Sequence, residues 1–112
     1  MEIKKVLCSS LKVDTSYQRN PQTTRVRKIA KEWNDDFANT LYISQREDGA
    51  MYVVDGNHTR LASIMAKGND ATLLAKVFTG LTKEEEAEMF IKLNTTLRRY
   101  EWAFSSCGRA PL

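Results

Sequence analysis

The sequence is poor in the side chains that build most metal centres and nucleophilic active sites. It has one histidine, His58, and two cysteines, Cys8 and Cys107, which lie near opposite ends of the chain. Zinc sites need clusters of cysteine and histidine at characteristic spacings, and a histidine–asparagine–histidine nuclease needs a second histidine. We therefore exclude these two kinds of site and assign no residue as a metal ligand. The cysteines favour reduced, inert thiols over a disulfide.

Long apolar runs and a strong charge of one sign are absent as well. No segment reaches the length of a transmembrane helix and the N-terminus has no apolar signal core, so we predict a soluble, cytoplasmic protein without a membrane partner. The net charge is +3 over 112 residues, which allows a nucleic-acid or phosphate partner without requiring one. The length fits one modest core. We predict one domain over residues 1–104 and a frayed or truncated tail over 105–112, and leave open the oligomeric state and any extension beyond Leu112.

Apolar periodicity in the chain predicts short strands alternating with helices. Strands are expected within residues 1–14, at 41–44 and 51–54 as a hairpin through Glu47-Asp48-Gly49, and at 72–78 inside the sheet. Helices are expected over 23–34, with Thr23 or Thr24 as its cap, after the turn at 55–57, and from a Thr82–Glu85 capping box to about 93. The elements predict an α+β fold with a small mixed sheet and packed helices.

The apolar stripes of the three predicted helices indicate which residues should share the core. Residues expected to be mostly buried are Val26, Ile29, Trp33, Leu61, Ala62, Met65, Phe90 and Ile91. The opposite face of the first helix carries a basic stretch over residues 25–31. We interpret this face as solvated, with a footprint on a phosphate backbone as the alternative.

Residues 52–68 join a strand to a helix through a very short turn, Asp55-Gly56-Asn57. Gly56 allows a ligand to approach the backbone closely, and the first amides of a helix have no intrahelical partner. This geometry binds phosphate. His58 and Arg60 lie in the first helical turn, so we predict an anion site here. A purely structural role is the alternative for His58, and a solvent-exposed position is the alternative for Arg60. For Asp55, fixing the turn is the default and metal binding is the alternative.

Residues 54–62, with the sequence VDGNHTRLA, resemble the ParB/sulfiredoxin superfamily, in particular the ParB-like nuclease-domain proteins of phages and mobile elements. The segments 11–14 and 17–19 are similar to the opening signature of that superfamily. Residues 25–34 resemble its first helix, and residues 81–90 with Asn94 resemble its closing helix and asparagine. The resemblance extends over nearly the whole chain, to about Arg99.

The resemblance implies an α+β domain in which the turn binds nucleotide phosphates at a helix N-terminus, with ATP or CTP and Mg²⁺ as the expected cofactors. The residues that it implies for binding are Gly56, Asn57, His58 and Thr59 from the turn, Arg19 from the opening loop, and Asn94. We add Gln18 and Arg60 as further candidate binding residues. His58 and Asp55 are the candidate catalytic residues. ParB proteins bind and hydrolyse CTP, sulfiredoxins use ATP, and other relatives are kinases or nucleases.

The chain departs from the superfamily pattern at two positions. Asn57 replaces the cysteine that follows the glycine in sulfiredoxins, which excludes thiol-based reductase chemistry. Thr59 replaces the arginine that follows the histidine, and Arg60 comes one residue later, about 100° further around the helix. Three functions stay open: a nucleotide-binding domain with or without hydrolysis, a DNA-binding or phosphodiesterase module, and a non-catalytic interaction domain.

Overall fold

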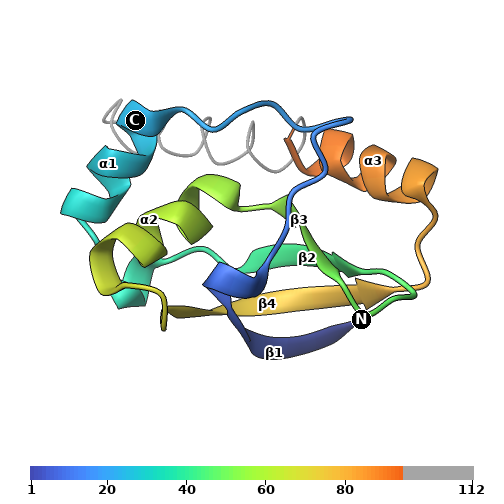
Figure 1. Ribbon diagram of the computed structural model, residues 1–112, viewed down its shortest axis with the longest axis horizontal. Helices are drawn as coiled ribbons and strands as arrows, with labels where there is room; N and C mark the ends of the chain where they lie inside the picture. The colour runs from blue at the N-terminus through green and yellow to red at the C-terminus, as the bar shows by residue number, and fades with distance from the viewer. Residues whose placement is uncertain (95–112) are drawn as a thin grey trace, which may run out of the picture.

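The structure, a computed structural model, describes residues 1–94, apart from the side chain of Phe37 (Figure 1). The predicted tail over residues 105–112 and Cys107 lie outside the described residues. The elements in chain order are β1 (Glu2–Leu7), α1 (Thr23–Lys31), β2 (Leu41–Gln45), β3 (Met51–Asp55), α2 (Asn57–Lys67), β4 (Thr72–Thr79) and α3 (Lys83–Lys92), with short 3₁₀ turns at Cys8–Ser10 and Asp35–Phe37. The predicted α+β fold class is confirmed.

The four strands form one mixed sheet in the order β1-β4-β2-β3. β1 and β4 are antiparallel, β2 and β3 form the predicted antiparallel hairpin, and β2 runs parallel to β4. β4 therefore lies inside the sheet, as its sequence predicts. The outer edge of β3 is covered by the chain at Lys12, whose N–H donates to Met51 and whose carbonyl accepts from Val53.

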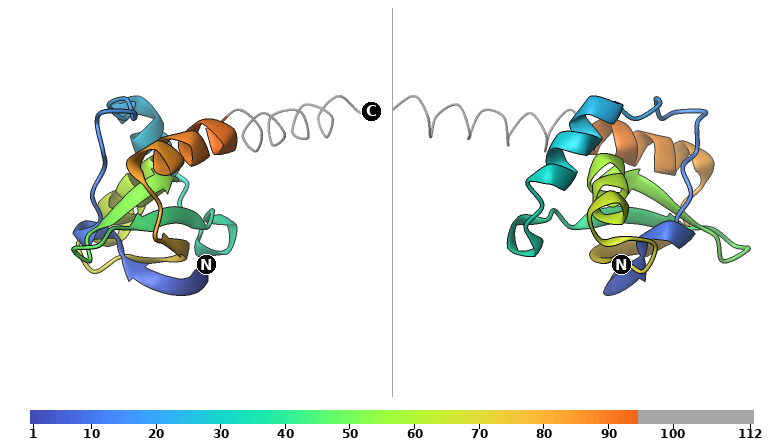
Figure 2. Two further views of the ribbon diagram at one scale, coloured as in Figure 1. Left: turned by 90° about the vertical axis from the view of Figure 1, so that its right-hand side faces the viewer. Right: turned by 60° about the vertical axis from the view of Figure 1, so that its left-hand side comes forward.

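The core lies between the sheet and α2. Its buried residues are Val6, Cys8, Leu11, Leu41, Ile43, Val53, Ala71, Leu73, Ala75 and Val77. Cys8 is a free, fully buried thiol, and the hydroxyl of Ser63 on α2 lies 3.3 Å from its sulfur. The small side chains of Ala62 and Ser63 bring α2 close to this core, and α1 packs beside α2 (Figure 2).

The helices bury faces that differ in part from the predicted stripes. Val26 and Ala62 are buried, and the larger residues Ile29, Trp33, Leu61 and Phe90 are half-buried. Met65 is 54% exposed and Ile91 is 58% exposed, so the prediction is wrong for these two. The buried residues of α2 include the small residues Thr59, Ala62 and Ser63, and Ser63 contacts Cys8. Because this face of the helix points inward, Met65 points outward.

α1 is shorter than predicted and ends at Lys31. Its N-cap is Gln22 and not a threonine, and the Gln22 side chain makes no capping bond. No helix within residues 1–94 is both long enough and apolar enough to cross a membrane.

Candidate functional site

The turn between β3 and α2 is built around Gly56. Its φ of +100° lies in the left-handed region, where glycine carries no steric cost. A Cβ at this position would lie 2.5 Å from Cδ2 of Leu41, which packs behind the turn. The glycine is therefore required by the backbone conformation and by the core. The sequence pattern attributed the glycine to the approach of a ligand, and the packing against Leu41 is a second reason for it.

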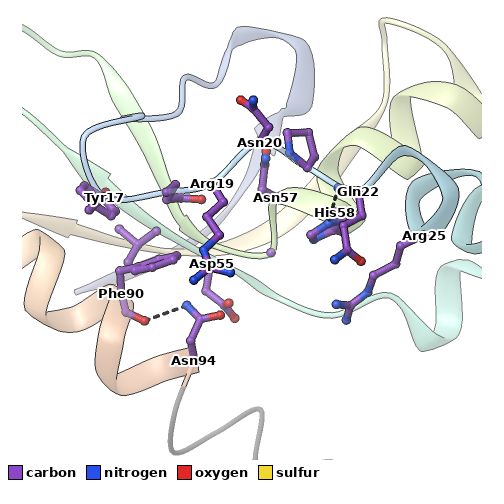
Figure 3. Close-up of a pocket in the computed structure, with 14 residues that line it drawn as sticks. Tyr17, Arg19, Asn20, Gln22, Arg25, Asp55, Asn57, His58, Phe90 and Asn94 are labelled. Atoms are coloured by element: carbon purple, nitrogen blue, oxygen red, sulfur yellow. Dashed lines mark hydrogen bonds between the residues drawn. The ribbon is translucent and has the colours of Figure 1, made fainter.

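α2 begins directly after this turn, and its N-terminus faces a cleft of about 460 Å³. Its first intrahelical bond runs from the Arg60 N–H to the Gly56 carbonyl, at 2.9 Å. The loop over residues 17–22 forms one wall of the cleft, and Phe90 and Asn94 at the end of α3 form another (Figure 3). Of the predicted site residues, the cleft brings together Gln18, Arg19, Asp55, Gly56, Asn57, His58 and Asn94.

Two of these residues reach the cleft from distant parts of the chain. The Arg19 side chain extends from the loop toward Asp55 and Asn94 (Figure 3). The Asn94 amide nitrogen donates to the Phe90 carbonyl at 2.8 Å, so this residue also caps the last turn of the helical segment. The expected approach of both residues to the Gly56 turn is thus present in the structure.

His58 connects the turn to the start of α1. Its Nε2 accepts a hydrogen bond of 3.1 Å from the backbone N–H of Gln22, the N-cap of α1. Since Nε2 acts as acceptor, the ring proton of the neutral imidazole is on Nδ1. His58 therefore makes a structural contact and also lines the cleft. A structural role and a role in anion binding are compatible for this residue.

Gln18 and Arg60 have structural contacts that limit their part in the site. The amide of Gln18 is buried and donates to the Val53 carbonyl, which holds the loop against β3. Arg60 does not line the cleft. Its guanidinium donates to Asn57 Oδ1 at 3.0 Å and to the Cys8 carbonyl at 3.3 Å, and burial lowers its pKa. The expected contact of Arg60 with phosphate is therefore not available in this structure, because its helical position turns it toward Cys8.

A second hollow, of about 280 Å³, also borders the turn. Thr59, which is buried, lines this second hollow and not the cleft. The two hollows share four wall residues, Arg25, Asp55, Gly56 and His58. The two hollows therefore adjoin at the Asp55-Gly56 turn and His58.

A buried ionic network supports the loop wall of the cleft. Arg46 Nη2 lies 2.6 Å from Glu86 Oε2 and 2.7 Å from Asp14 Oδ2, and the Tyr17 hydroxyl donates to Glu86 Oε2 at 2.7 Å. The guanidinium also lies 3.6 Å from the centroid of the Tyr52 ring. Burial raises the pKa of Glu86, but the bonds from Arg46 and Tyr17 outweigh it, so its pKa is below the ordinary value. Hydrogen bonds from Ser16 and Arg46 hold the pKa of Asp14 well below its usual range.

A family model described as "Family of unknown function (DUF6551)" matches residues 13–98. The chain belongs to this family. No curated protein matches the sequence. Among solved structures, the chain is similar to the C-terminally truncated chromosome-partitioning protein ParB from Caulobacter crescentus, complexed with CTP-gamma-S, with a TM-score of 0.70 and 14% sequence identity.

The similarity to ParB covers 85% of this DUF6551 chain and 53% of the ParB chain, so the chain spans about half the length of that structure. At this sequence identity the match shows the fold, which is ParB-like.

Sequence reasoning missed several residues that line the cleft in this DUF6551 domain. They are Tyr17, Asn20, Pro21, Gln22, Arg25, Val54 and Phe90. A signal existed for Arg25, which is in the first turn of a helix that directly follows the loop carrying Arg19. A signal also existed for Glu86, which supports the cleft from outside, because it is four residues before Phe90 and therefore on the same helical face.

Proposed function

We propose that this domain binds a nucleotide in the cleft, with the phosphates at the N-terminus of α2. The observation that carries the proposal is the helix N-terminus facing a cleft lined by Arg19, Arg25 and His58. The first amides of a helix and the positive end of its dipole favour an anion, and arginine adds charge-assisted hydrogen bonds. The ParB structure of the same fold is a complex with CTP-gamma-S, which supports a nucleotide as the ligand.

The size and the lining of the cleft agree with a nucleotide. Its volume of about 460 Å³ lies within the usual range of small-molecule sites. Tyr17 and Phe90 line it as an aromatic pair, with ring centroids 5.2 Å apart. Aromatic side chains offer a surface on which a base packs. We infer that the base lies toward this pair and the phosphates toward Gly56.

Asp55 is the one carboxylate among the residues that line the cleft. A Mg²⁺ ion that accompanies a nucleotide is usually held by one or two carboxylates together with the phosphates, so Asp55 is the side chain that would hold it. Asp55 is also our candidate base for hydrolysis, because His58 Nε2 is engaged with Gln22. Binding is the part of the function that the geometry supports best, and hydrolysis by Asp55 depends on it.

Isothermal titration with CTP, ATP, GTP and UTP, with and without Mg²⁺, tests the proposal. We expect one nucleotide to bind and to raise the melting temperature, since a ligand of the native state stabilises it. Arg19→Ala should weaken binding about tenfold through the loss of a charge-assisted contact. Arg27→Ala is the matched control, because Arg27 is an exposed arginine that does not line the cleft, and it should change affinity less than about twofold.

Two results would count against nucleotide binding. Equal weakening by both arginine substitutions would indicate a non-specific charge effect. A short DNA duplex that binds more tightly than any nucleotide, with an affinity independent of Arg19 and dependent on the basic residues of α1, would favour the DNA-binding alternative.

A further inference from the structure

The second hollow adjoins the proposed nucleotide site, because four residues line both. Arg25, Asp55, Gly56 and His58 line both concave surfaces. The remaining lining of the second hollow comes from α1, α2, β4, β2 and the segment just before β2. A phosphate placed at the turn therefore lies where the cleft and the second hollow meet. The second hollow is smaller than the cleft and fits part of a ligand better than a whole nucleotide.

The sheet places a lysine in this hollow. Lys76 on β4 is opposite Tyr42 on β2, and Tyr42 is opposite Asp55 on β3, next to a register shift between Tyr42 and Ile43. Directly opposed residues on neighbouring strands point to the same face of a sheet. The Lys76 amine is held over Tyr42, 5.2 Å from the ring centroid and 3.4 Å from the hydroxyl. Lys76 and Asp55 both line the second hollow, so the lysine and the turn border the same space.

The charges of the second hollow favour an anion. Arg25 and Lys76 each contribute a positive charge, and Asp55 contributes one negative charge. The hydroxyl-bearing residues Thr40, Tyr42 and Thr59 also line the hollow, and hydroxyl groups donate to phosphate oxygens. The sequence pattern predicted neither Arg25 nor Lys76 as site residues.

We propose that the second hollow is a subsite for the terminal phosphate of a nucleoside triphosphate, with Lys76 as the residue that selects triphosphate over monophosphate. This proposal rests on the proposed nucleotide-binding function. The base and the first phosphate occupy the cleft, and the phosphate chain passes the Gly56 turn to reach Lys76 and Arg25.

Titration of CMP, CDP and CTP, with the adenosine series in parallel and Mg²⁺ present, tests the subsite. The variants are Lys76→Met, which keeps the aliphatic stem over Tyr42 and removes the charge, and Lys76→Arg, which restores the charge. Lys5→Met is the control, because Lys5 is opposite Leu74 on the same sheet face but outside the hollow. Melting temperatures near the wild-type value establish that each variant is folded.

We expect the wild-type protein to bind CTP, or ATP, at least about tenfold more tightly than the monophosphate. Lys76→Met should remove most of this preference while monophosphate affinity changes less than about twofold. Lys76→Arg and Lys5→Met should keep it.

An unchanged triphosphate preference in Lys76→Met would overturn the subsite, and so would equal losses for monophosphate and triphosphate. Either result would leave the proposed function in place. A wild-type protein that binds no member of either series would remove the proposed function, and the subsite with it.

Discussion

Replacement of Glu86 should destabilise the domain far more than replacement of its neighbours on α3. Its side chain is 1% exposed and accepts bonds from Arg46 Nη2 at 2.6 Å, Arg46 Nε at 3.2 Å and the Tyr17 hydroxyl at 2.7 Å. Glu86→Ala removes all three acceptor contacts and leaves the Arg46 guanidinium paired with Asp14 among the described residues.

The expected loss of stability in Glu86→Ala depends on how exposed the remaining Arg46 charge is. Removal of one partner from a buried ion pair costs about 3–5 kcal/mol, because the other charge stays uncompensated. Arg46 is 21% exposed and keeps Asp14 at 2.7 Å, so we expect the lower end, about 3 kcal/mol. A small domain has a total stability of about 5–15 kcal/mol, so this loss is a large part of it.

The cost should also depend on pH in a defined direction. The pKa of Glu86 is lowered in the folded state, so its contribution is present above the unfolded value of about 4.3 and is lost as the pH falls through the folded pKa. The difference between wild type and Glu86→Ala should therefore be largest near pH 7 and should shrink below about pH 4.

Urea unfolding of wild type, Glu86→Ala and Glu84→Ala at several pH values measures both effects. Glu84 is the matched control, because it is an exposed glutamate in the same first turn of α3 and experiences the same helix dipole. Its replacement should change stability by less than about 1 kcal/mol. Equal losses for the two variants, or a Glu86→Ala cost that is independent of pH, would refute the assigned role of the network.

Two further predictions concern the turn and the core. Gly56→Ala should lower stability by about 1–3 kcal/mol with or without a nucleotide, because of the left-handed backbone and the contact with Leu41, and a melting curve at the wild-type temperature would contradict this. Ile43→Ala should cost about 2–5 kcal/mol because Ile43 is fully buried, whereas Met65→Ala should cost less than about 1 kcal/mol because Met65 is 54% exposed. Chemical unfolding of both variants checks this pair, and a reversed order would show that α2 packs through its predicted stripe.

Features that depend on residues close in the chain could be predicted from the sequence. The Thr82–Glu85 capping box is present in both directions, at 3.1 Å and 2.9 Å, because each partner lies within one helical turn of the other. The hairpin through Glu47-Asp48-Gly49 follows from a turn with glycine at a positive φ. The strand–turn–helix around Gly56 depends in the same way on short-range signals.

Features that depend on packing between distant segments could not be predicted in this way. The rotation of α2 is set by the fit of Ser63 against Cys8, which is 55 residues away in the sequence, and this rotation exposes Met65. The same effect directs Arg60 toward Cys8 and away from the cleft.

The site shows the same division between local and distant contacts. Arg19 and Asn94 were expected near the turn through the resemblance to a known superfamily. Nothing local in the sequence connects Lys76 to Asp55, because their relation depends on β2 lying between their strands.

The contact between Gly56 and Leu41 affects how members of this family should be compared. Since the backbone conformation and the leucine behind it both exclude a side chain, relatives should retain glycine at this position whether or not they bind a ligand. A glycine that is invariant in an alignment would then indicate only that the relatives share this fold, and not that they bind a ligand. Variation at exposed or half-buried polar positions such as Arg19 and Lys76 would be the more informative marker for separating members that have kept a ligand from those that have lost it.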